Sequence, residues 1–191
     1  MDSLPPINVR SRERRVSSSD SLDFFRTPPG ATQALLEKES FPGRVWECAC
    51  GDGIMSRAME VAGYDVFSSD LVDRGYGHVG RDFLLTDSLP QGVESVVTNP
   101  PFKLGTEFVQ HALNMGARKV AILQRVAFLE GQERASGIFA DGKLSRVWVF
   151  AKRITLWRGD DPNPQDKGGA MAFCWCVWER GHRGTQLGWI R

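Results

Sequence analysis

The stretch Val45-Trp46-Glu47-Cys48-Ala49-Cys50-Gly51-Asp52-Gly53 points to the fold class of this 191-residue chain. An apolar run at 44–50 favours a β-strand, it ends in a glycine turn, and residues 54–62 follow with the spacing of an amphipathic helix. A turn of this kind lets a ligand approach the backbone at the carboxyl edge of a sheet. Because a Gly-x-Gly turn alone is weak evidence, its neighbours along the chain matter.

Strands and helices alternate on both sides of this turn. A helix is predicted at 30–39, a second at 108–115, and strands at 65–69, 93–98 and 119–123, with another strand ending near 81–83. Two further strands, 146–150 and 170–178, are separated by a loop at 158–169 and are expected to pair antiparallel. We therefore predict an α/β fold with a mixed, mostly parallel seven-stranded sheet, helices on both faces and an antiparallel last strand.

The composition fits one folded domain. Hydrophobic residues make up 41% of the chain, charged residues 25%, and the formal net charge is +1. No apolar run approaches the roughly 20 residues of a membrane-spanning helix, and no secretion signal is recognisable, so a cytoplasmic protein is expected. Residues 1–20 are rich in Ser and Arg and lack apolar periodicity, which predicts a flexible tail before a single domain at 21–191.

The four cysteines form two Cys-x-Cys pairs, Cys48/Cys50 and Cys174/Cys176, each in a predicted strand. Structural zinc sites usually separate paired cysteines by two or more residues, so buried free thiols are favoured over a zinc site. No metal is therefore predicted.

A nucleoside-containing ligand is indicated by Asp70, which follows the glycine turn by roughly 20 residues at the end of the next strand. A carboxylate there can accept hydrogen bonds from both ribose hydroxyls. A third glycine that would help cradle a pyrophosphate is replaced by Ser56, which favours a nucleoside without pyrophosphate. Asp82 could accept from an adenine amino group while Phe83 packs on the ring, although Asp82 is equally suited to capping a helix.

A transfer site is indicated by Asn99-Pro100-Pro101-Phe102, which ends the strand at 93–98 in a rigid corner. The Asn99 side-chain oxygen and the Pro100 carbonyl can accept both hydrogens of a conjugated amine, which frees the nitrogen lone pair for attack on a methyl group. Phe102 can stack on a planar base. The alternative is a plain proline corner with a buried phenylalanine.

Together these motifs resemble class I S-adenosylmethionine-dependent amino-methyltransferases, in particular small phage-type DNA adenine N6-methyltransferases, over residues 24–180. The resemblance implies a Rossmann-like methyltransferase fold, S-adenosylmethionine as cofactor, and a phage or bacterial context. Phe25-Arg26-Thr27-Pro28-Pro29 is similar to the family's methionine-binding motif, whereas Cys48 stands where the family usually has Pro. The implied cofactor-binding residues are Phe25, Thr27, Pro28, Glu47, Ala49, Gly51, Gly53, Asp70, Leu71, Asp82, Phe83 and Asn99.

The same resemblance implies N6 of adenine in DNA as the target, reached by rotating the base out of its stack, and nucleic acid as the partner. Its implied catalytic residues are Asn99, Pro100, Pro101 and Phe102. Arg125, Arg153 and Arg158 are predicted to contact substrate phosphates, although each could be an ordinary surface charge. Little of the chain remains for a recognition domain, so a short or permissive target sequence is expected.

Three alternatives remain open. The Asn-Pro-Pro-aromatic corner is also similar to that of RNA adenine methyltransferases and of glutamine methyltransferases that modify release factors. The glutamine enzymes often have Tyr at the position of Phe102, which favours a nucleobase here. The alternative from another class is a non-catalytic scaffold of the same fold, against which the intact Gly51, Gly53, Asp70 and Asn99 argue. The oligomeric state is not predicted.

Overall fold

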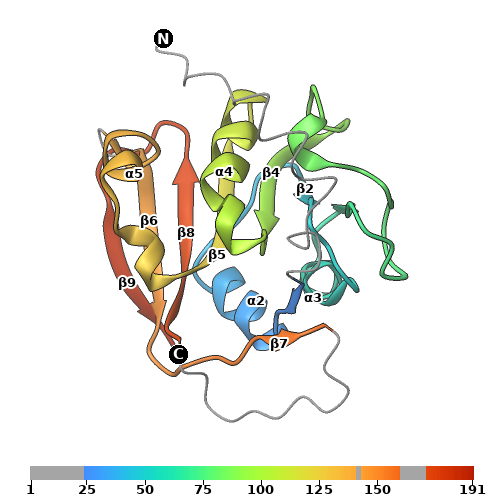
Figure 1. The fold of residues 1–191 in the computed structure, drawn as a ribbon, viewed down its shortest axis with the longest axis horizontal. Helices are drawn as coiled ribbons and strands as arrows, with labels where there is room; N and C mark the ends of the chain where they lie inside the picture. Colours follow the sequence, from blue (N-terminus) through green and yellow to red (C-terminus); the bar gives the residue numbers. More distant parts are fainter. Residues whose placement is uncertain (1–23, 141–142, 160–170) are drawn as a thin grey trace.

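A seven-stranded mixed sheet organises the chain (Figure 1). The computed structural model describes residues 24–140, 143–159 and 171–191, so the predicted tail at 1–20 and most of the loop at 158–169 lie outside the described residues. Within the described sheet, β8 alone runs against its neighbours. The strands, in spatial order, are β3 (Val66–Ser68), β2 (Arg44–Glu47), β4 (Val93–Thr98), β5 (Lys119–Arg125), β8 (Phe173–Glu179), β6 (Leu144–Phe150) and β9 (Gln186–Ile190).

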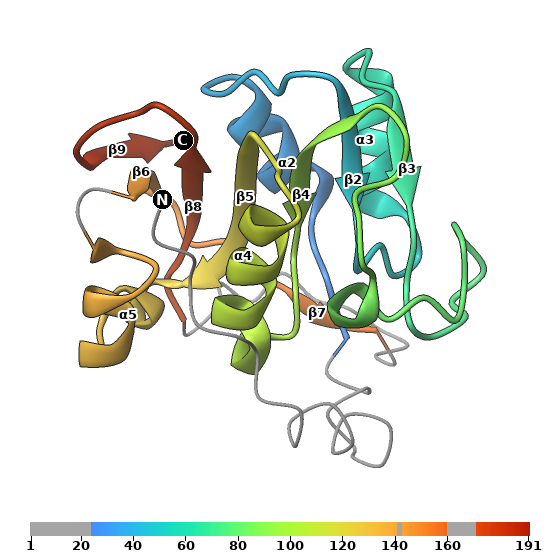
Figure 2. The same cartoon turned by 90° about the horizontal axis from the view of Figure 1, so that it is seen from above.

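Helices cover both faces of this sheet (Figure 2). Side chains alternate along each strand, so Val45 and Val97 pack toward α2 (Pro29–Leu36) and α3 (Ile54–Val61), while Trp46 and Val96 pack toward α4 (Gly105–Asn114). The remaining helical segments are η2 (Phe83–Leu85), η3 (Phe102–Leu104), η4 (Val126–Leu129) and α5 (Gln132–Ser136). The predicted α/β architecture is thus confirmed. None of the described helices is both long and apolar enough to cross a membrane.

Two strands differ from the prediction. The strand expected to end near Asp82 does not form, because the chain after β3 is a loop with one isolated bridge between Ser69 and His78. The seventh strand is instead β9, which pairs parallel with β6 and was not predicted. Its residues Leu187 and Trp189 are exposed, so the alternating apolar pattern of a half-buried strand is weak there. The antiparallel strand predicted to be the last is therefore the penultimate strand, β8.

A second, two-stranded sheet joins β1 (Phe25–Arg26) to β7 (Trp157–Arg158), with Phe25 opposite Arg158. The Phe24 carbonyl extends this pairing by accepting the Gly159 N–H at 2.9 Å. Both strands are only two residues long and neither was predicted. Their pairing brings the motif that begins at Phe25 against the chain that follows β6.

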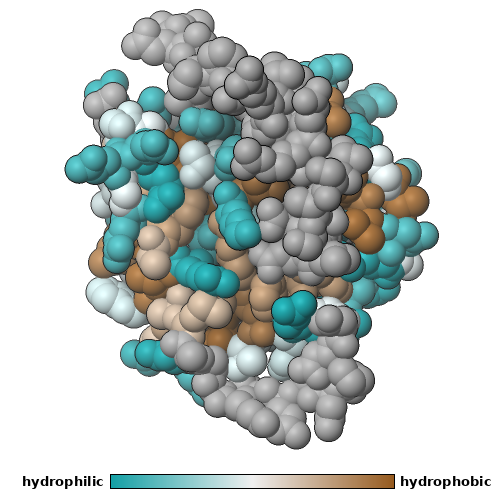
Figure 3. Space-filling view, viewed as in Figure 1, coloured by the Kyte–Doolittle hydropathy of each residue, from teal (hydrophilic) through white to brown (hydrophobic). Residues whose placement is uncertain are grey.

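Charged side chains are buried at the amino edge of the strands. Glu39 is 5% exposed and forms ion pairs with Lys119 at 2.6 Å and with Arg146. Trp148 also donates its indole N–H to Glu39 at 2.7 Å, and Arg146 reaches Glu179. The buried carboxylate is therefore surrounded by donors. Elsewhere the surface is mixed, with apolar patches between hydrophilic residues on the face shown in Figure 3.

Candidate active site

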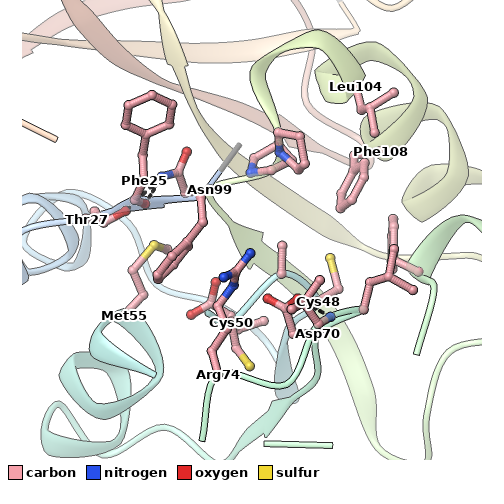
Figure 4. A pocket seen from close by; sticks show the side chains of 18 of the residues that line it. Phe25, Thr27, Cys48, Cys50, Met55, Asp70, Arg74, Asn99, Leu104 and Phe108 are labelled. Atoms are coloured by element: carbon pink, nitrogen blue, oxygen red, sulfur yellow. Dashed lines mark hydrogen bonds between the residues drawn. The ribbon is translucent and has the colours of Figure 1, made fainter. Parts of the chain in front are cut away.

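A pocket opens at the carboxyl ends of β2, β3 and β4 (Figure 4). These strands are parallel, so the residues that follow them lie along one edge of the sheet. β1 and the loop after β3 contribute the other walls. Of the predicted site residues, those that line the pocket are Phe25, Thr27, Glu47, Ala49, Asp70, Leu71, Asp82, Phe83, Asn99, Pro100, Pro101 and Phe102; Pro28, Gly51, Gly53, Arg125, Arg153 and Arg158 do not.

Asn99 is held at one end of the pocket by hydrogen bonds to Phe25 and Thr27. Its side-chain amide donates to the Phe25 carbonyl at 3.2 Å and to the Thr27 hydroxyl at 3.0 Å. A backbone carbonyl can only accept, so these contacts fix the NH₂ group toward β1 and leave Oδ1 on the opposite side of the amide. Asn99 Oδ1 is buried and has no hydrogen-bond partner among the described residues. Asn99 therefore presents a fixed, unsatisfied acceptor in the wall of the pocket.

Asp70 lies at the other end, close to Cys48 and Cys50 (Figure 4). One of its carboxylate oxygens accepts the Gly51 N–H at 2.8 Å and the other accepts the Val72 N–H at 2.9 Å. These contacts fix the carboxylate, and each oxygen retains a lone pair for a hydroxyl donor.

Asp82 caps a short helix at the wall of the pocket. It lines the pocket, and its carboxylate caps η2 by accepting the Leu84 N–H at 2.9 Å. Phe83 next to it is 2% exposed, stacks on Phe108 with ring centroids 4.8 Å apart, and meets Trp46 edge-on at 5.0 Å. Phe83 is therefore mainly a core residue that also forms part of the pocket wall.

The two turn glycines are needed for packing between protein segments. Gly51 and Gly53 have φ values of +56° and +81°. A Cβ at Gly51 would lie 2.3 Å from the Phe24 ring, and one at Gly53 would lie 2.4 Å from the Tyr76 ring. We expected these glycines to let a ligand approach the backbone. Instead, Phe24 and Tyr76 occupy the space beside them.

Glu47 is a buried residue of the pocket wall and forms no ion pair with any residue that the structure describes. It accepts from the Ser56 hydroxyl at 3.2 Å and from the Thr98 hydroxyl at 3.4 Å. Burial raises the pKa of Glu47 well above its usual range, and the nearby Asp70 charge also raises it. Burial likewise raises the pKa of the Cys50 thiol to about 12, so this pocket-lining thiol is protonated at neutral pH. Among the residues that the structure describes, no three His, Cys, Asp or Glu side chains are grouped to hold a metal ion.

Phe102 forms the aromatic wall near Asn99. Its ring lies 5.7 Å from Phe25 and 5.8 Å from Phe173, and the Arg125 guanidinium lies over it at 4.7 Å. Arg125 therefore contacts a residue of the pocket wall, Phe102, without lining the pocket itself. Arg153 and Arg158 are exposed, and Arg158 lies on β7 opposite Phe25.

Several solved structures share this architecture. A protein of Pyrococcus horikoshii, provisionally described as an RNA methyltransferase, superposes with a TM-score of 0.60 at 14% identity, over 85% of this chain and 89% of its own. The modification subunit of a provisional type I restriction enzyme from Vibrio vulnificus gives 0.55 at 14% identity, over 94% of this chain and 50% of its own. A provisional class I S-adenosylmethionine-dependent methyltransferase of Listeria monocytogenes gives 0.54 at 14% identity, over 89% and 64%.

The chain has the class I methyltransferase fold. It spans about half the length of the Vibrio subunit. No protein-family model and no curated protein matches the sequence.

Within this methyltransferase fold, sequence reasoning missed several pocket residues. Arg26 forms an ion pair with Asp52 of the glycine turn at 2.7 Å, which ties β1 to that turn. Phe24 packs under Arg74 at 4.2 Å, and Arg81 lies over Trp46 at 5.2 Å. Phe24, Arg26, Arg74 and Arg81 come from segments without strand or helix periodicity, so the sequence carried no sign of their contacts.

Proposed function

We propose that this protein transfers a methyl group from S-adenosylmethionine to N6 of adenine in nucleic acid, with DNA as the favoured substrate. The observation that carries the proposal is the buried Asn99 Oδ1, which has no partner among the described residues although its NH₂ group is anchored. A buried acceptor left unpaired costs about 1–3 kcal/mol. The N–H of a substrate amine supplies the missing donor.

The opposite end of the pocket fits the nucleoside part of the cofactor. Asp70 is fixed by two backbone N–H groups and keeps lone pairs for ribose hydroxyls. Asp82 lines the same pocket and is suited to an adenine amino group. Met55 and Ala49 add apolar wall between the two ends of the pocket. When bound, S-adenosylmethionine supplies an electrophilic methyl group.

The corner at Asn99 prepares the amine for transfer. The lone pair of an exocyclic amine is delocalised into its ring, so the nitrogen is a poor nucleophile while planar. Asn99 Oδ1 and the Pro100 carbonyl can each accept one N–H, which favours a pyramidal nitrogen with its lone pair free. Pro100 and Pro101 restrict the backbone, so these acceptors stay in place without reorganisation.

Adenine in nucleic acid is favoured over other amines by Phe102, whose ring offers a surface for a flat base. The Vibrio protein is described as part of a DNA modification enzyme, which supports DNA. RNA is the second candidate, because the Pyrococcus protein is described as an RNA methyltransferase.

The test is to incubate the protein with tritiated-methyl S-adenosylmethionine and separate pools of unmethylated DNA, RNA and cell protein. Labelled product is then digested and its modified unit identified by mass spectrometry. We expect N6-methyladenine in DNA. Label in RNA would move the assignment to the second candidate, and label on glutamine would contradict a nucleic-acid substrate. Cofactor binding by calorimetry without any transfer would favour a scaffold, and no cofactor binding would refute the whole proposal.

A further inference from the structure

Arg125 is a half-buried cation without a carboxylate partner among the described residues. Its Nε is buried and lacks a hydrogen-bond partner in the part of the chain that the structure describes, and its guanidinium lies over the Phe102 ring, 4.7 Å from the ring centroid. Two other arginines near the core are paired with carboxylates, Arg26 with Asp52 and Arg146 with Glu39. Arg125 therefore differs from them in lacking an internal anion.

Arg125 lies at the same edge of the sheet as Asn99, which forms the end of the pocket where the substrate amine is proposed to bind. β4 and β5 are parallel neighbours, and Thr98 lies opposite Ile122. Asn99 follows Thr98 directly, and Arg125 is three residues beyond Ile122, so both lie at the carboxyl edge of the sheet. Phe102 links them, because it belongs to the same corner as Asn99 and carries the guanidinium on its ring.

A guanidinium in this state is suited to an anion that arrives with the substrate. Partial burial weakens its hydration, and the unpaired Nε leaves a donor that water does not satisfy. The planar guanidinium can stack on an aromatic ring and bind a phosphate through two parallel N–H bonds. A glutamine side chain in a protein carries no such anion, whereas each nucleotide carries a phosphate beside its base.

We propose that Arg125 binds the phosphate of the nucleotide whose amine is held by Asn99, with Phe102 fixing the guanidinium plane. This inference rests on the proposed function and makes the acceptor a nucleotide unit. Arg125 is thus a positioning residue, because it orients the base relative to Asn99 through the sugar and phosphate and does not touch the reacting atoms.

The test measures binding of mononucleotides without relying on transfer. The cofactor site is first saturated with S-adenosylhomocysteine, so that added adenosine compounds reach only the acceptor end. Adenosine, adenosine 5′-monophosphate and adenosine 3′-monophosphate are then compared by equilibrium dialysis. We expect one of the monophosphates to bind about tenfold more tightly than adenosine. In Arg125→Gln this difference should disappear, and in Arg125→Lys part of it should remain because the charge is kept.

Arg183→Gln is the matched control, since Arg183 is exposed in the turn between β8 and β9 and should leave the difference unchanged. Equal affinities of the three compounds for the wild type, no binding of any of them, or a preference that persists in Arg125→Gln would overturn the inference. Transfer to nucleic acid is measured on the same preparations. Transfer without a phosphate preference refutes only the role of Arg125, and a phosphate preference without transfer refutes only the proposed function.

Discussion

Two buried glutamates at opposite edges of the sheet differ in what surrounds them. At the amino edge, Glu39 receives hydrogen bonds from Arg146, Lys119 and Trp148. Burial alone would raise the pKa of Glu39, but these donors outweigh it and lower the pKa below the usual value of 4.5. At the carboxyl edge, Glu47 accepts hydrogen bonds from the Ser56 and Thr98 hydroxyls and from the Ser56 backbone N–H, but it forms no ion pair among the described residues. Burial raises its pKa well above 4.5.

At the amino edge, the buried charged groups have partners within the protein, whereas at the carboxyl edge a buried polar group lacks one among the described residues. Around Glu39, each buried charge has an internal partner, so this edge can contribute to stability without a ligand. Around Glu47, the same pocket also contains the unpaired Asn99 Oδ1. Buried polar groups are normally paired, and exceptions of this kind concentrate at functional sites. Among the described residues, the carboxyl edge therefore contains a buried acceptor and a buried carboxyl group that lack the charged partners found at the amino edge.

The largest effect on stability is expected for Glu39→Gln. The substitution removes the fully buried carboxylate from Lys119 and Arg146 and leaves them only the more exposed Glu179, which costs roughly 3 kcal/mol. Urea denaturation followed by circular dichroism measures the loss. Glu37→Gln is the control, because Glu37 is exposed and its change should stay within about 0.5 kcal/mol. If both variants lose equal stability, the amino edge is not the stabilising network described above.

A smaller effect is expected for Glu47→Gln, and its size depends on pH. A raised pKa in the folded state means that Glu47 supports folding below 4.5 and loses that contribution as pH rises toward its folded pKa. Glu39 and Glu179, whose pKa values are lowered, contribute above 4.5 and lose their contribution as pH falls below it.

Glu47→Gln should therefore stabilise the ligand-free protein relative to wild type at neutral pH, and the gain should shrink toward pH 4.5. Denaturation curves across this range measure both trends. A gain that grows as the pH is lowered would have the wrong sign and would argue against an unpaired, buried Glu47.

The sequence predicted the regular part of the molecule well. The run that begins at Val45 has a strong strand-turn-helix pattern, and the strand before Asn99 is rich in β-branched residues, so both elements and the sheet class were predictable. The positions of Asp70 and Asn99 followed directly, because residues after parallel strands share one edge.

Contacts between irregular segments were not predictable. The β1–β7 pair involves two residues from each strand, and its partners lie more than 130 positions apart, so no local pattern marks it. The unpredicted packing of Phe24 against Gly51 and Gly159 depends on that pairing. The loop after β3 replaced an expected strand because Gly75, Gly77 and Gly80 all adopt positive φ, which breaks extended structure. Local sequence patterns thus predicted which sheet edge carries the candidate site, but contacts between distant segments form part of its walls.

The central claim is that Asn99 holds the substrate amine, and transfer by Asn99→Ala tests it most directly. Cofactor affinity and methyl transfer are measured on the same preparation, with Asn114→Ala at the exposed end of α4 as the matched control. We predict that Asn99→Ala loses transfer by roughly 100-fold or more while still binding S-adenosylmethionine, and that Asn114→Ala changes neither. Transfer by Asn99→Ala equal to that of the wild type would contradict the assignment.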